Sequence, residues 1–190
     1  GMGKKLIAII PARKNSKRLI NKNLLKINGK KMFNYTLQAA LNCNKIDKIL
    51  ISTDIPSLIK KNNKKVFHIN RPKNLCQDHC STESAIKHAV NFFFKHDKRE
   101  IENIILLQPT SPFRDSIEIK KAINEFEKKK LDTMFSAYKD KLTIWKKKKK
   151  LYPISYSLKR RVRSQFTNDL IIENGAIYIF KKNGFDNFNN

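Results

Sequence analysis

Cationic side chains follow the first apolar stretch of the chain. Leu6–Ile10 consists of five consecutive apolar residues, which predicts a buried parallel strand, and Pro11 is expected to end it because proline lacks a ladder N–H. Arg13, Lys17 and Lys22 lie in the segment that comes next. Open α/β sheets bind their ligands beyond the carboxyl ends of their strands. The pattern therefore predicts an anion site, and the expected anion is a nucleoside triphosphate.

The same segment offers neutral groups between its cations. Backbone N–H groups, together with the side chains of Asn15 and Ser16, can cradle phosphate oxygens. Cations held where negative charge develops on pyrophosphate would also promote its departure. The alternative is a solvated basic loop, which is common in a chain so rich in lysine.

Two further polar segments follow expected strands. Ser52, Thr53 and Asp54 stand at the end of a strand expected at 48–53, where they can line a ligand crevice or cap a turn. Capping is favoured for Asp54, because aspartate is a preferred cap residue.

Arg71 follows a strand expected at 66–69, and Ser81 and Thr82 precede an expected helix. The side chains of arginine, serine and threonine can bind the polar groups of a nucleoside. A loop and a helix N-cap explain the same residues without a ligand.

A stiff polar segment follows the strand expected at 103–107. It reads Gln108-Pro109-Thr110-Ser111-Pro112, and its two prolines can hold the polar side chains in place at the strand exit. Hydrogen bonding to a sugar would then cost little conformational entropy, because these side chains are already held in place. A structural turn is the alternative.

The high positive charge raises the possibility of a nucleic-acid partner. The formal net charge is +25, and 33 of the 41 basic residues are lysines spread along the whole chain. The run Lys146–Lys150 has aromatic residues only at its ends, Trp145 and Tyr152, whereas single-strand binding favours aromatics interleaved with the cations. No nucleic-acid partner is therefore expected, and a basic nucleic-acid-binding protein is kept as a minor alternative.

Cysteine usage and hydropathy predict a cytoplasmic protein without a membrane partner. No apolar run approaches the roughly 18 residues needed to span a bilayer, and no signal-peptide pattern precedes the first strand. Cys43, Cys76 and Cys80 are an odd number, which makes a disulfide framework unexpected. Cys76, His79 and Cys80 have an unusual spacing for zinc and are interpreted as ordinary residues.

Strand and helix patterns alternate along the chain, which predicts a doubly wound α/β sheet. Asp115 is the candidate N-cap of the last helix, with Glu118 three residues on to complete a capping box. The segment 139–170 breaks the alternation and is expected to project from the sheet as an arm. Strands are expected at 6–10, 48–53, 66–69, 103–107, 132–138 and 175–180, and helices at 32–43, 82–96 and 116–129.

These motifs occur in the order found in the acylneuraminate cytidylyltransferases, the CMP-sialic acid synthetases, and the chain resembles this family over most of residues 6–182. The resemblance implies a Rossmann-like, mostly parallel sheet of the nucleotide-diphospho-sugar transferase type. It assigns 3–138 and 171–190 to the nucleotidyltransferase domain and 139–170 to a dimerisation arm inserted in it, and it implies a homodimer. The implied reaction joins CTP to a nonulosonic acid, giving a CMP-sugar and pyrophosphate.

The resemblance also implies roles for individual residues. Arg13 and Lys22 are the catalytic candidates, and Arg163 in the arm would bind the sugar carboxylate with its guanidinium fork across the dimer. Many relatives have glycine where Arg18 stands, so the loop here is expected to turn differently. The nucleotide-binding candidates are Ala12, Arg13, Asn15, Ser16, Lys22, Asn23, Arg71, Ser81 and Thr82, and the sugar-binding candidates are Gln108, Thr110, Ser111, Arg163 and Gln165.

Mg²⁺ is expected from the resemblance, because family members hold it with a later Asp-x-Asp pair. Asp186 has no second aspartate two residues away, so no metal ligands are predicted in this sequence. A catalytically impaired, truncated homologue that binds cytidine nucleotide is therefore the alternative to a working enzyme. The sequence leaves sialic, legionaminic, pseudaminic and 3-deoxy-octulosonic acids open as sugars.

Overall fold

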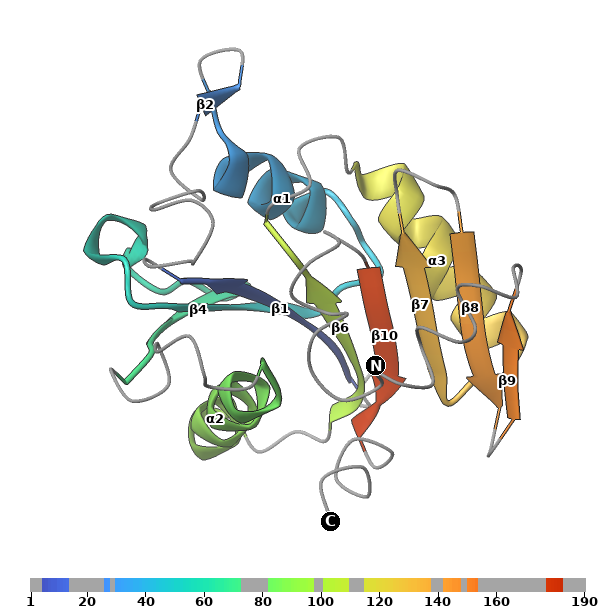
Figure 1. The fold of residues 1–190 in the computed structure, drawn as a ribbon. Helices are drawn as coiled ribbons and strands as arrows, with labels where there is room; N and C mark the ends of the chain where they lie inside the picture. The colour runs from blue at the N-terminus through green and yellow to red at the C-terminus, as the bar shows by residue number, and fades with distance from the viewer. Residues whose placement is uncertain are drawn as a thin grey trace.

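The computed structural model describes residues 5–13, 26–27, 30–72, 82–97, 101–109, 115–137, 142–147, 150–153 and 177–182 of the chain. Within these ranges an eight-stranded sheet has the order β5-β4-β1-β6-β10-β7-β8-β9, and β2 pairs with β3 in a separate two-stranded sheet (Figure 1). The elements are β1 Lys5–Ala12, β2 Lys26–Ile27, β3 Lys30–Lys31, α1 Met32–Leu41, β4 Lys48–Thr53, the 3-10 helix η2 Pro56–Leu58, β5 Val66–Asn70, α2 Thr82–His96, β6 Ile101–Leu107, α3 Ser116–Lys128, β7 Thr133–Ala137, β8 Leu142–Lys147, β9 Lys150–Pro153 and β10 Ile177–Lys181.

Half of the main sheet is parallel and reverses its winding at β1. β1 pairs in parallel with β4 on one side and β6 on the other, and β5 pairs in parallel with β4. The chain therefore moves outward from β1 to β4 and β5, and then returns to the opposite side of β1 with β6. This reversal is the topological switch point at which open α/β sheets bind ligands.

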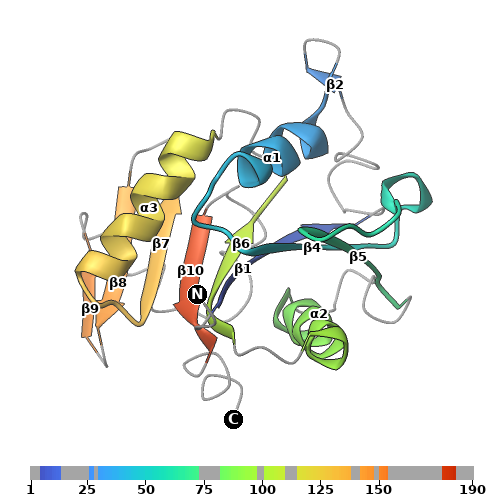
Figure 2. The same cartoon turned by 180° about the vertical axis from the view of Figure 1, so that it is seen from behind.

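Helices cover both faces of the sheet. α1 and α3 pack on one face and α2 on the other, as two opposite views show (Figures 1 and 2). The apolar residues of β1 alternate between the two resulting cores, because successive strand side chains point to opposite faces. Leu6, Ala8 and Ile10 lie in the core of α1 and α3, while Ile7 and Ile9 lie in the core of α2.

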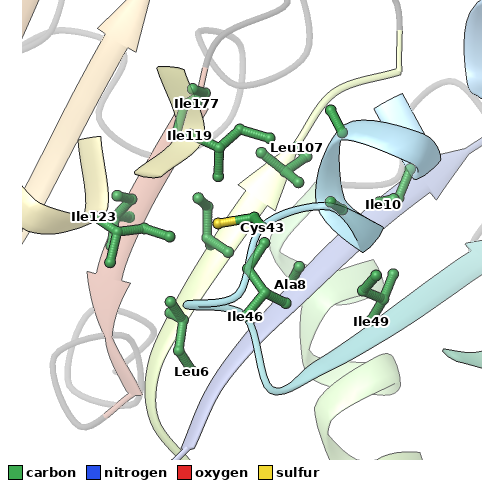
Figure 3. Packing of buried hydrophobic residues seen from close by; sticks show 14 of the residues in the cluster. Leu6, Ala8, Ile10, Cys43, Ile46, Ile49, Leu107, Ile119, Ile123 and Ile177 are labelled. Atoms are coloured by element: carbon green, nitrogen blue, oxygen red, sulfur yellow. The ribbon is translucent and has the colours of Figure 1, made fainter. Parts of the chain in front are cut away.

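Figure 3 shows the first of these cores from close by. Leu6, Ala8 and Ile10 of β1 belong to the same cluster as Ile119 and Ile123 of α3. A strand buried on both faces needs apolar residues throughout, which is why the uninterrupted run after residue 5 correctly predicted a buried parallel strand. The predicted doubly wound α/β class is confirmed.

The start of α3 follows the predicted cap. Asp115 has extended backbone angles, and its Oδ1 accepts a hydrogen bond of 2.8 Å from the N–H of Glu118. Ile119, Ala122, Ile123 and Phe126 form the buried stripe of this helix. This element can be predicted from local sequence, because the cap and the stripe both lie within it.

Pro11 does not end β1 as expected. The strand continues to Ala12, and Pro11 pairs with Ser52 of β4. Pairing between β1 and β6 extends only as far as Ile9 and Leu106. Pro11 thus borders a neighbouring strand on one side only, where its missing N–H is tolerated.

The other half of the sheet is built from antiparallel pairs. β10 lies between β6 and β7 and is antiparallel to both, while β8 and β9 continue the sheet beyond β7. β8 and β9 fall within the segment 139–170, and in that segment they are the parts that the structure describes. No helix in the described ranges has both the length and the apolar character needed to cross a membrane.

A carboxylate joins the beginnings of β1 and β4. Asp47 Oδ2 accepts a hydrogen bond of 2.8 Å from the N–H of Leu6, and the N–H of Asp47 donates to the carbonyl of Leu6 at 3.0 Å. These two bonds align β1 with β4 at the end of the sheet opposite the candidate site.

Candidate functional site

The four parallel strands β5, β4, β1 and β6 end at the same edge of the sheet. Ala12 pairs with Thr53, and Thr53 pairs with Asn70, so the last residues of β1, β4 and β5 form one row. The chain leaves this row through Arg13, Asp54 and Arg71. Three residues whose side chains can bind phosphate, sugar or base therefore follow the ends of three neighbouring strands.

Arg13 and Gln108 lie on the two sides of the switch point. Arg13 is half-buried and follows β1, while Gln108 follows β6 and is 8% exposed. A ligand bound beyond the carboxyl ends of β1 and β6 would have a cation after one strand and an amide after the next. The two residues are 95 positions apart in the sequence but follow neighbouring strands of the sheet.

Arg71 is held through both its main chain and its side chain. It is 7% exposed, and its backbone N–H donates to the carbonyl of Thr53 at 2.9 Å. Its Nε donates to Ser52 Oγ at 3.3 Å, and its Nη2 donates to the carbonyl of Ser52 at 3.3 Å. The sequence placed Arg71 at the end of a strand, but the bonds to Ser52 had no local signal.

Thr53 stabilises the turn that follows β4. Its hydroxyl is fully buried and accepts a hydrogen bond of 2.9 Å from the N–H of Ile55. This bond fixes the direction in which the chain leaves the sheet at half-buried Asp54. The structural interpretation of the segment Ser52–Asp54 therefore holds for Thr53.

His88 of α2 is a neighbour of Arg71 that sequence reasoning missed. Burial, then the charges of Arg71 and Lys95, lower the pKa of His88 below its ordinary value of 6.5. Its buried Nδ1 has no hydrogen-bond partner among the described residues. In the sequence His88 stands among the apolar residues Ala85, Ile86 and Ala89 of the same helix, so it resembled an ordinary core position.

The lowered pKa of His88 predicts a pH-dependent stability. Above pH 6.5 the imidazole is neutral in both the folded and the unfolded chain; below it, the unfolded chain binds the proton first and the free energy of unfolding falls. The fall continues until the pH passes the folded pKa. His88→Leu should reduce the slope below pH 6.5 in urea unfolding measured at several pH values, and a slope equal to that of the parent chain would contradict the assignment.

Several predicted site residues lie outside the described residues. Thr82 is described only as the first residue of α2. The predictions for the others stay predictions: Asn15, Ser16, Lys22, Asn23, Ser81, Thr110, Ser111, Arg163 and Gln165.

The described residues include one carboxylate at the carboxyl edge of the parallel strands. Within the described ranges, no group of three His, Cys, Asp or Glu side chains is placed to hold an ion. Asp54 stands at the carboxyl edge as one carboxylate, and protein Mg²⁺ sites use one or two carboxylates together with substrate phosphates. No metal ligand is assigned among the described residues.

The sheet order, with helices on both faces, defines a doubly wound α/β protein. A solved CMP-2-keto-3-deoxy-manno-octonic acid synthetase, in complex with CTP, has the same fold with a TM-score of 0.59 and 18% sequence identity. The similarity covers 98% of this chain and 78% of that one.

A family model described as cytidylyltransferase matches residues 7–183, and the chain belongs to this family. An N-acylneuraminate cytidylyltransferase of Escherichia coli is 39% identical over 66% of this chain and 29% of its own length. A CMP-N,N'-diacetyllegionaminic acid synthase of Legionella pneumophila is 33% identical over 63% of this chain and 52% of its own length. The resemblance predicted from the motifs is thereby confirmed, and the chain spans less than two thirds of these relatives.

Proposed function

We propose that this chain carries the substrate site of a cytidylyltransferase that activates a nonulosonic acid with CTP. The anomeric hydroxyl oxygen of the sugar attacks the α-phosphorus of CTP, forming a new P–O bond as the bond to pyrophosphate breaks. The hydroxyl proton is released, and the products are a CMP-sugar and pyrophosphate. The relatives that act on N-acylneuraminate and diacetyllegionaminic acid support an acidic nine-carbon sugar as the second substrate.

One observation carries the proposal, the presence of Arg13, Arg71 and Gln108 at the same carboxyl edge around the switch point. Arg13 would neutralise the triphosphate and the charge that grows on departing pyrophosphate, as cations do in phosphoryl transfer. Arg71 would hold the nucleoside. Gln108 would hydrogen-bond the sugar from the β6 side of the switch point.

The remaining predicted residues complete this proposal. Lys22, Asn15, Ser16 and Asn23 would join Arg13 around the triphosphate, and Ser81 and Thr82 would join Arg71. On the sugar side the proposed partners of Gln108 are Thr110, Ser111, Arg163 and Gln165. The homodimer, with Arg163 reaching the partner's sugar, is also part of the proposal and is supported by the resemblance.

The test measures CTP binding and turnover separately. Isothermal titration calorimetry should detect CTP binding to the 190-residue chain, with UTP binding more weakly. Pyrophosphate release should then follow when CTP and Mg²⁺ are combined with sialic, legionaminic, pseudaminic or 3-deoxy-octulosonic acid. Release with one of these sugars would also identify the substrate.

Each negative result has a separate meaning. CTP binding without pyrophosphate release from any sugar would reject transfer and leave a nucleotide-binding chain. Failure to bind CTP would reject the proposed site itself. Binding of DNA or RNA that falls steeply with salt and is unaffected by CTP would favour the nucleic-acid alternative.

A further inference from the structure

Arg71 is attached to β4 through both its main chain and its side chain. Its N–H bonds the Thr53 carbonyl at 2.9 Å, and its guanidinium makes two contacts of 3.3 Å with Ser52. Ser52 is fully buried, and Arg71 is 7% exposed. A nearly buried cation needs acceptors in fixed positions, because removing it from water without them is costly.

The pattern of donors fixes the plane of the guanidinium. Nε and Nη2 share one edge of the planar fork, and both point to Ser52, one to its hydroxyl and one to its carbonyl. The other edge, which includes Nη1, is therefore turned away from β4. Only the hydroxyl contact depends on the identity of the side chain at position 52, because any residue supplies the carbonyl.

We infer that Ser52 is a positioning residue that orients Arg71 toward the nucleoside half of CTP, an inference that rests on the proposed function. Ser52 does not itself contact the nucleotide. Its hydroxyl accepts from Nε and so selects one rotation of the fork. Without that acceptor, Arg71 would keep its charge and its strand position but lose the orientation that base recognition requires.

Calorimetry on Ser52 variants tests this role. Ser52→Ala should raise the Kd for CTP about tenfold, which is the loss expected for a hydrogen bond to a charged group. Ser52→Thr retains the hydroxyl and should restore a Kd close to that of the parent chain. The matched control is Thr36→Val, because Thr36 is fully buried in α1 and its Oγ1 has no partner among the described residues. Its Kd should not change.

A double variant separates positioning from general structure. In an Arg71→Met background, Ser52→Ala should cause no further rise in Kd, because the residue that it orients is gone. An additional rise of the same size would overturn the inference, as would a Ser52→Ala chain that binds CTP like the parent. Failure of the parent chain to bind CTP would instead reject the proposed function, so the two failures are distinguishable.

Discussion

Arg13→Ala is expected to lower kcat/KM for the proposed transfer by about 10²–10³, the cost of removing one group that stabilises transition-state charge. Arg13 is the first residue beyond β1, and Ala12 before it is fully buried and paired with Thr53. The backbone there is thus anchored in the sheet, and truncating a half-buried side chain should leave the fold intact. Pyrophosphate release at low CTP concentration measures the change.

Two further variants serve as controls for Arg13→Ala. Lys120→Ala removes one positive charge from an exposed position of α3 and should leave kcat/KM unchanged. Arg13→Lys keeps the charge but loses the planar fork and should recover part of the lost rate. Equal values of kcat/KM for Arg13→Ala and Lys120→Ala would remove Arg13 from the proposed triphosphate site.

Phe93→Ala is expected to lower the free energy of unfolding by about 3–5 kcal/mol, the range for removing a large core side chain. Phe93 is fully buried, and its ring meets Phe67 of β5 edge to face, with 5.6 Å between centroids. This contact joins α2 to the strand that positions Arg71. Because small domains are stable by only about 5–15 kcal/mol, the loss would be a large part of the total.

The neighbouring residue supplies the control for Phe93. Phe94 has the same side chain on the same helix but is 54% exposed. Phe94→Ala should therefore change the urea midpoint far less. Similar midpoints for the two variants would show that α2 does not pack through Phe93 as described.

The sequence best predicted those structural features whose cause lies within a few residues of one another. The cap at Asp115 and the stripe that includes Ile119 both belong to α3 itself, and both were predicted. The uninterrupted apolar residues of β1 predicted a strand buried on both faces. The parallel strands then located the edge at which Arg13, Arg71 and Gln108 lie.

The features that sequence did not predict depend on distant partners. The bond between Arg71 and Ser52 joins residues 19 positions apart, and the bond between Asp47 and Leu6 joins residues 41 positions apart. Pro11 remains in its strand only because β6 has stopped pairing before it. Neither periodicity nor motif spacing contains such information, because it arises only when the strands are assembled.

The position of β10 has a consequence for how the protein is made. β10 fills the gap between β6 and β7, yet roughly 70 residues separate β6 from β10 in the sequence, which a ribosome adding about 5–20 residues per second needs several seconds to synthesise. During that interval the edge of β6 is unpaired, because β10, which covers Ile104 and Ile105 on that side in the folded protein, has not yet been synthesised. Until β10 has left the ribosome, the nascent chain therefore exposes the apolar edge of β6, and binding by a chaperone would be most useful in that interval.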